Sequence, residues 1–342
     1  MPNAMKPLYD QLKPMGYSLK FLKDFVLPDW WDDEVAATSA GLQQARMILS
    51  RSLGLDFLEL TQGRVRAGSG AVAYRCTQRT DTENLPTVAA FALQVASHVT
   101  YAHKQKGDEA ADPNRIPQAT KIRDWLLKQN TQFLTFSDMV EICWAYGIPV
   151  IQIHHSPFKK KPDGIALQTE HGPAIVLFKT NSQAPWLLFP LAHEFGHIAR
   201  KHLAANAIIL DMGLNANPTK AREVTDEQEE EADSYAFQML TGVSSPDFSP
   251  IWAKVPRRPS GTDLAPVCSR EGKVYRIDPG FLALCYGYEH QNWAAANAAL
   301  KIIGRNRENP QSFIYEQLLE NVDLDSLADD TAAFIQRVLT PP

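Results

Sequence analysis

The sequence predicts an α+β fold: a small mixed β-sheet packed on two helices, with helical N- and C-terminal extensions. Three observations indicate this. Apolar residues at helical spacing dominate residues 1–135. Three short runs rich in β-branched residues then lie between residues 148 and 179, separated by turn residues. Two more helical segments follow, one around His193-Glu194-Phe195-Gly196-His197 and one that begins with a run of acids after residue 225.

Length and composition place the chain among globular proteins. Its 342 residues are too many for one small core, so we expect four parts. These are a mostly helical N-terminal region, a core with the sheet, a Pro-rich connection and a helical C-terminal region, at residues 1–135, 136–242, 243–265 and 266–342. A net charge of −5 does not indicate the basic surface that would bind nucleic acid or an anionic membrane.

The cysteines indicate a reducing compartment. All four stand far apart and form no CxxC pair, which argues against a disulfide framework or a cysteine-bound metal. No apolar run reaches the ~20 residues that span a bilayer, and the first residues lack the apolar segment of a signal peptide. We therefore expect a cytoplasmic protein with no membrane partner.

In the N-terminal region, capping and turn residues bound three helices. They are expected over Ala40–Leu53, Pro86–Lys104 and Pro117–Lys128, with Ser39 as the N-cap of the first and Gly54 beyond its end. Residues 33–62 could instead hold a helix-turn-helix. Acids are interspersed with the arginines of that segment and leave no basic recognition face, so direct DNA binding is not expected.

In the core, Ser137 is placed to cap a helix that runs through Tyr146. Strands are expected over Ile148–Ile153, Gly164–Thr169 and Ala174–Lys179. An edge strand of this sheet could pair with an extended peptide. In the C-terminal region, helices are expected over 279–303, 310–320 and 325–339, each starting at or just after an Asp or Asn.

The pentapeptide at residues 193–197 is the strongest functional signal. Two histidines four apart on a helix lie on one side, one turn apart, so both imidazoles can reach one metal ion. Glu194, beside the first histidine, then lies where it can take a proton from a water molecule that the metal activates. The competing interpretation is a core helix that carries two hydrogen-bonded histidines.

Zinc held by His193 and His197 needs a third protein ligand and leaves a fourth position for water. Glu229 is the best candidate, because positions 229, 232, 233, 236 and 240 form one helical stripe whose alanines permit close packing. Asp233, one turn later, could accept the outer N–H of a zinc-bound histidine. Acids in a first helical turn are also favoured without a metal, so the neighbouring Glu230 and Glu231 remain fallback ligands.

The expected chemistry is hydrolysis of a peptide bond with one Zn²⁺ per chain. Zinc would lower the pKa of water towards ~7 and polarise the carbonyl, and Glu194 would carry the proton to the leaving amine. The sequence does not identify a second oxyanion donor. Tyr235 is a candidate by its place in the sequence. His202 is disfavoured, because on a continuous helix it would lie about 140° round from His197.

These residues resemble the ImmA/IrrE family of bacterial and phage metallo-endopeptidases. The resemblance covers about residues 136–242. It rests on Gly147-Ile148-Pro149-Val150, Asp163-Gly164-Ile165-Ala166, Pro173-Ala174-Ile175-Val176-Leu177, Leu191-Ala192-His193-Glu194-Phe195-Gly196-His197-Ile198 and Glu229-Glu230-Glu231-Ala232-Asp233-Ser234-Tyr235-Ala236. Tyr235 stands where the family commonly has phenylalanine. The resemblance implies a zincin-like core in which His193, His197 and Glu229 bind zinc and Glu194 is the catalytic base.

Members of that family typically cleave a helix-turn-helix repressor or antitoxin, in mobile-element transfer, the DNA-damage response or phage defence. The resemblance therefore implies a site-specific cytoplasmic endopeptidase whose substrate is a DNA-binding regulator. The alternative is a catalytically silent zincin-like module that binds partners or regulates transcription through its helical flanks.

Overall fold

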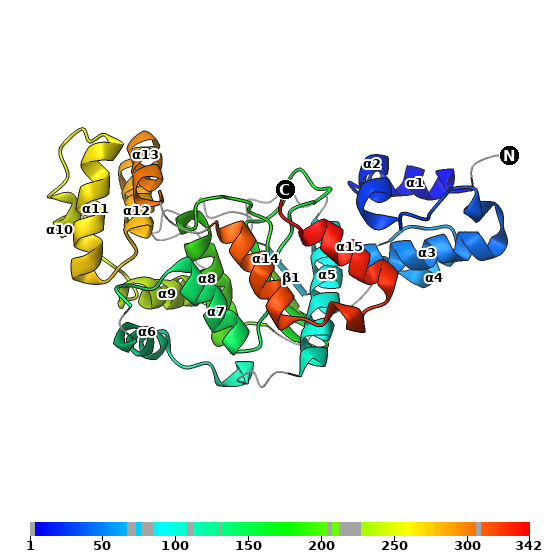
Figure 1. Ribbon diagram of the computed structural model, residues 1–342, viewed down its shortest axis with the longest axis horizontal. Coiled ribbons are helices and arrows are strands. Elements are labelled where there is room, and N and C mark those ends of the chain that lie inside the picture. The colour runs from blue at the N-terminus through cyan, green and yellow to red at the C-terminus, as the bar shows by residue number, and fades with distance from the viewer. Residues whose placement is uncertain are drawn as a thin grey trace.

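A computed structural model of the chain describes residues 4–66, 73–76, 85–107, 112–129, 131–203, 207–211, 227–305 and 309–342. It shows an α+β protein that is mostly helical, with a small sheet near its middle (Figure 1). The helices before residue 130 are α1 (Lys6–Leu12), α2 (Leu19–Phe21), α3 (Ser39–Leu53), α4 (Phe57–Thr61), α5 (Leu85–Lys106) and α6 (Ala119–Lys128). None of the helices in the described ranges combines the length and apolar composition needed to cross a bilayer.

The sheet has five strands in the order β1-β5-β3-β4-β2. They are β1 (Ala73–Cys76), β2 (Val150–Gln152), β3 (Gly164–Thr169), β4 (Gly172–Leu177) and β5 (Ala207–Asp211). The antiparallel β3–β4 hairpin forms the centre, while β2 runs parallel to β4 and β1 parallel to β5. The three expected strands are therefore present, and each of their ends lies within two residues of the expected bound. The sequence did not predict β1 or β5.

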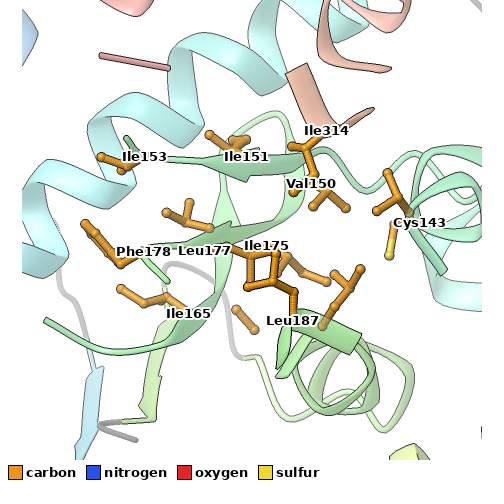
Figure 2. Packing of buried hydrophobic residues seen from close by; sticks show 14 of the residues in the cluster. Cys143, Val150, Ile151, Ile153, Ile165, Ile175, Leu177, Phe178, Leu187 and Ile314 are labelled. Atoms are coloured by element: carbon orange, nitrogen blue, oxygen red, sulfur yellow. The ribbon is translucent and has the colours of Figure 1, made fainter. Parts of the chain in front are cut away.

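Both faces of the β3–β4 hairpin are covered by helices. Alternate residues of a strand point to opposite faces. Gly164 faces α8 (Pro185–Ala199), whereas the hydroxyl of Thr169 lies 2.9 Å from that of Thr100 on α5. Figure 2 shows the side chains of this core, with Leu187 of α8 on one side of the sheet. The sheet is therefore buried on both faces, which accounts for the nearly continuous apolar sequence of its strands.

Two N-caps precede the residues that the sequence suggested. Thr38 rather than Ser39 caps α3, and Thr135 rather than Ser137 caps α7 (Phe136–Ala145). Thr135 forms a reciprocal capping box with the acid three residues later, so two backbone N–H groups are satisfied at once. Gly54 ends α3 in the left-handed conformation, with φ 65°, as expected.

The C-terminal half is more divided than the sequence suggested. The expected helix over 279–303 is two helices, α12 (Pro279–His290) and α13 (Trp293–Ile303). Gln291 takes a left-handed conformation with φ 53°, and the side chain of Asn292 caps α13. The remaining helices of this half are α9 (Glu227–Thr241), α10 (Ser249–Trp252), α11 (Gly261–Tyr275), α14 (Pro310–Asn321) and α15 (Asp329–Leu339).

The Pro-rich segment at 243–265 is not wholly irregular, as had been expected. It contains α10 and the first turn of α11. Ser260 and Asp263 form a capping box at the start of α11, and this local signal outweighs the prolines nearby. Figure 1 places α10, α11, α12 and α13 together at one end of the molecule and α1 to α4 at the other.

Arg123 of α6 connects three helices. Its Nη1 donates to the carbonyl oxygens of Met239 (3.1 Å) and Leu240 (2.8 Å) at the end of α9, and its Nη2 donates to that of Arg276 (2.5 Å) beyond α11. Burial, with a smaller contribution from Arg276, lowers the pKa of Arg123 to about 10, so the guanidinium stays charged at neutral pH. A cation at helix C-termini satisfies their last carbonyl groups and complements the helix dipole.

We expect Arg123→Met to lower the free energy of unfolding by about 2 kcal/mol, because it leaves buried carbonyl groups without their charged donor. Urea denaturation followed by circular dichroism measures this. Lys121→Met, on the exposed side of the same helix, should change stability by less than about 0.5 kcal/mol. Equal stabilities for the two variants would contradict the capping role of Arg123.

Candidate metal centre

The site forms where α8 and α9 pack closely. A Cβ atom on Gly196 would lie 2.9 Å from the carbonyl oxygen of Ala232 and 3.2 Å from its Cα. The two backbones therefore touch at this point, and only glycine fits on α8. Ala232 and Ala236 present small, fully buried side chains from α9. The small-residue stripe inferred from the sequence is the face that meets α8.

His193, His197 and Glu229 are brought together at this contact. Their nearest nitrogen and oxygen atoms all lie within 4.8 Å of one another, and the residues are 0, 0 and 5% exposed. The two Nε2 atoms are 3.0 Å apart. Glu229 places Oε2 3.5 Å from Nε2 of His193 and Oε1 3.4 Å from Nε2 of His197. These three residues could hold a metal ion.

The fallback ligands lie elsewhere. Glu230 is exposed. Glu231 accepts hydrogen bonds from Nη2 of Arg200 (2.8 Å) and Nε2 of His202 (2.8 Å). These bonds, that of Arg200 first, lower the pKa of Glu231 to about 2, so this carboxylate is ionised at neutral pH.

The outer nitrogen of each candidate histidine has its own partner. Nδ1 of His193 lies 2.8 Å from Oδ1 of Asp233, which is the hydrogen bond that the sequence predicted. Nδ1 of His197 lies 3.0 Å from Nδ1 of His202. A carboxylate only accepts hydrogen bonds, so Asp233 fixes the proton of His193 on Nδ1.

The same reasoning fixes the tautomer of His197. The Nε2–H of His202 donates to Glu231, so Nδ1 of a neutral His202 is an acceptor. His197 must then donate from its own Nδ1. Burial is the main cause that lowers the pKa of His197 to about 4, which keeps this ring neutral at physiological pH.

Both Nε2 atoms consequently carry lone pairs, and they face each other and a carboxylate in a buried space. Two imidazole nitrogens and a carboxylate at these distances can be bridged by a shared proton or by a cation. The residues therefore fit a metal ion chemically as well as in position. The competing interpretation, a core helix with two hydrogen-bonded histidines, shares these contacts, and measurement of metal binding distinguishes the two.

Glu194 points from α8 towards the start of β3. A Cβ atom on Gly164 would lie 3.0 Å from its Cγ and 3.1 Å from its Oε1, so the glycine leaves room for this side chain. Over Gly164–Leu167, β3 pairs with β4 on one side and β5 on the other. The strand beside Glu194 is therefore not an edge, and the expected pairing of a peptide cannot occur on β3 itself.

Tyr235, the candidate oxyanion donor, is engaged elsewhere. Its hydroxyl donates to the carbonyl of Pro117 at 2.8 Å, and its ring lies 6.0 Å from that of Phe195. A role at an oxyanion would require the bond to Pro117 to break. In this structure Tyr235 joins α9 to the segment that precedes α6.

His202 is the site residue that the sequence reasoning missed. That reasoning assumed a continuous helix, but α8 ends at Ala199 and Lys201 turns left-handed with φ 61°. The backbone N–H of His202 then returns to the carbonyl of His197 at 3.0 Å. Left-handed helix ends usually carry glycine or asparagine, so a lysine there offers no signal.

The C-terminal region forms one wall of the site. The ring of Phe281 on α12 stacks on Phe189 of α8 with centroids 6.0 Å apart, and Phe189 lies 6.3 Å from His193. A Cβ on Gly280 would lie 2.3 Å from Cγ of Pro185, so α12 contacts the start of α8 directly. The helices after residue 260 therefore help to bury the candidate ligand His193.

Comparisons with known proteins identify no relative: no protein-family model matches the chain, and neither the curated proteins nor the solved structures contain a match. The arrangement of the side chains is therefore the basis for a functional proposal.

We expect Gly196→Ala to weaken metal binding, because the new methyl group pushes α9 and Glu229 away from α8. It should also destabilise the metal-free protein by about 1–3 kcal/mol, the usual cost of overpacking. Isothermal titration with zinc and urea denaturation measure the two effects. Ala199→Ser, three residues later on α8, is the control. Unchanged zinc affinity in Gly196→Ala would show that the helix contact does not set the site.

Proposed function

We propose that the protein is a zinc-dependent endopeptidase of the ImmA/IrrE type that cleaves a regulatory protein. The observation that carries this proposal is the convergence of three buried side chains that can each offer a ligand atom, His193, His197 and Glu229, with Glu194 next to the first histidine. Two imidazoles and one carboxylate, with a fourth position left for water, are a typical catalytic zinc set. A structural zinc site would normally have four protein ligands.

The chain's own residues account for the proton transfers. Zinc, when bound, supplies Lewis-acid activation of water and of the scissile carbonyl. Glu194 accepts the proton of the attacking water and returns it to the nitrogen of the leaving amine. Gly164 leaves the space that the Glu194 carboxylate occupies. Asp233, which only accepts hydrogen bonds, supports the tautomer of His193 whose Nε2 is open to a metal.

The burial of the site supports limited rather than digestive cleavage. The candidate ligands and Glu194 are at most 5% exposed. The rigid surface of a folded protein cannot reach groups so deep, whereas an extended segment can. Together with the resemblance over residues 136–242, this supports a specific protein substrate, and a helix-turn-helix repressor or antitoxin is the class we propose.

We expect the purified protein to contain one zinc per chain and to cleave such a regulator when the two are co-expressed. The helix-turn-helix protein encoded by a neighbouring reading frame is the first substrate to test. Glu194→Gln should retain zinc but reduce cleavage at least ~100-fold, the usual contribution of a general base. Elemental analysis and mass spectrometry of the products measure these effects.

Glu230→Gln is the matched control, since it removes an exposed carboxylate close to the ligand Glu229. It should leave both zinc content and cleavage unchanged. Absence of stoichiometric zinc from the wild-type protein would refute the proposal. Cleavage that Glu194→Gln leaves unaffected would refute the role of Glu194 as general base, whereas zinc binding with no cleavage of any regulator would favour the silent binding module.

A further inference from the structure

We propose that His202 is a positioning residue of the metal centre, which sets the tautomer and ring orientation of His197. The inference rests on the proposed zinc site, because it assigns a role to a residue that would not touch the metal. It is carried by a chain of three hydrogen-bonded side chains, Glu231, His202 and His197.

The chain runs from the protein surface to a buried ligand. Arg200 and Glu231 form an ion pair at 2.8 Å, with side chains 48 and 37% exposed. The His202 side chain is only 4% exposed and lies between Glu231 and His197. The other histidine, His193, is held directly by a carboxylate, that of Asp233. The two histidines therefore depend on different kinds of partner.

The end of α8 fixes His202 in place. The N–H of Lys201 donates to the carbonyl of Ile198, and the N–H of His202 donates to that of His197, both at 3.0 Å. His202 consequently contacts His197 twice, through its backbone and through its ring. The backbone bond holds residue 202 beside His197, and the ring bond then acts on the imidazole of His197.

Each ring nitrogen of His202 has one hydrogen-bonding role. Nε2–H donates to Glu231, and Nδ1 accepts the proton of His197. An asparagine at position 202 keeps an acceptor two atoms beyond Cβ, where Nδ1 now lies. A leucine keeps the bulk but offers no acceptor, so the two variants separate the hydrogen bond from simple packing.

The test compares His202→Asn, His202→Leu and Glu231→Gln with the control Glu230→Gln. Zinc affinity is measured by competition with a chromophoric chelator, and the melting temperature of each metal-free protein reports folding. We expect His202→Leu to bind zinc ~10–100-fold more weakly, as is usual when the partner of a metal-binding histidine is lost. His202→Asn should retain most of the affinity. Glu231→Gln should also retain most of it, because glutamine keeps an acceptor and the charge that is lost is partly exposed and screened.

Side-chain ¹H–¹⁵N NMR of the zinc-loaded protein gives an independent readout. It should show His197 protonated on Nδ1 and His202 on Nε2. Wild-type affinity in His202→Leu, or equal losses in the Asn and Leu variants with unchanged melting temperatures, would overturn the assignment while leaving the zinc site intact. Absence of zinc binding by the wild-type protein would instead refute the proposed function, and the histidine tautomers in the metal-free protein would then still test the His197–His202 bond.

Discussion

The close contact between α8 and α9 is the constraint on which the rest of the structure depends. Gly196 meets the backbone of Ala232 where even one added methyl group would clash. Only at that separation can Glu229 approach both histidines at 3.4–3.5 Å. Other elements hold the two helices in place from outside. Arg123 binds the end of α9, and Gly280 brings α12 against the start of α8.

Burial of the candidate metal centre lowers the folding stability of the metal-free protein. Two imidazoles and a carboxylate meet in a space that water barely reaches, and removing such polar groups from water costs free energy. The buried sheet, with α5 on one face and α8 on the other, supplies the apolar packing that offsets this cost. A metal ion bound by these residues would stabilise the folded chain, since metal binding and folding are coupled at such sites. Local strain of this kind is typical of functional sites.

The sequence predicted those parts of the site that follow from local periodicity. Histidines four apart and the stripe that joins Glu229 to Ala232 and Asp233 are properties of single helices, so they could be read before any packing was known. The strands of the β3–β4 hairpin were found for the same reason. The features that the sequence did not predict depend on reversal of the chain direction and on pairing between segments far apart in the sequence. β1 and β5 lie 134 residues apart at their first paired positions, Ala73 and Ala207, and His202 reaches the site only because Lys201 turns left-handed.

The two histidines of the candidate metal centre have different hydrogen-bond partners, a carboxylate for His193 and an imidazole for His197. This difference indicates how His202 would contribute to metal binding. Asp233 acts on His193 with a full charge at 2.8 Å. His197 has the imidazole of His202 as its partner, and the carboxylate behind that ring, Glu231, is partly exposed and already paired with Arg200. Solvent screens such a surface pair, so its charge adds little at the depth of His197. The contribution of His202 must therefore come from the geometry of its hydrogen bond. Its Nδ1 accepts the proton on Nδ1 of His197, and the lone pair on Nε2 of His197 then points at Glu229 and His193.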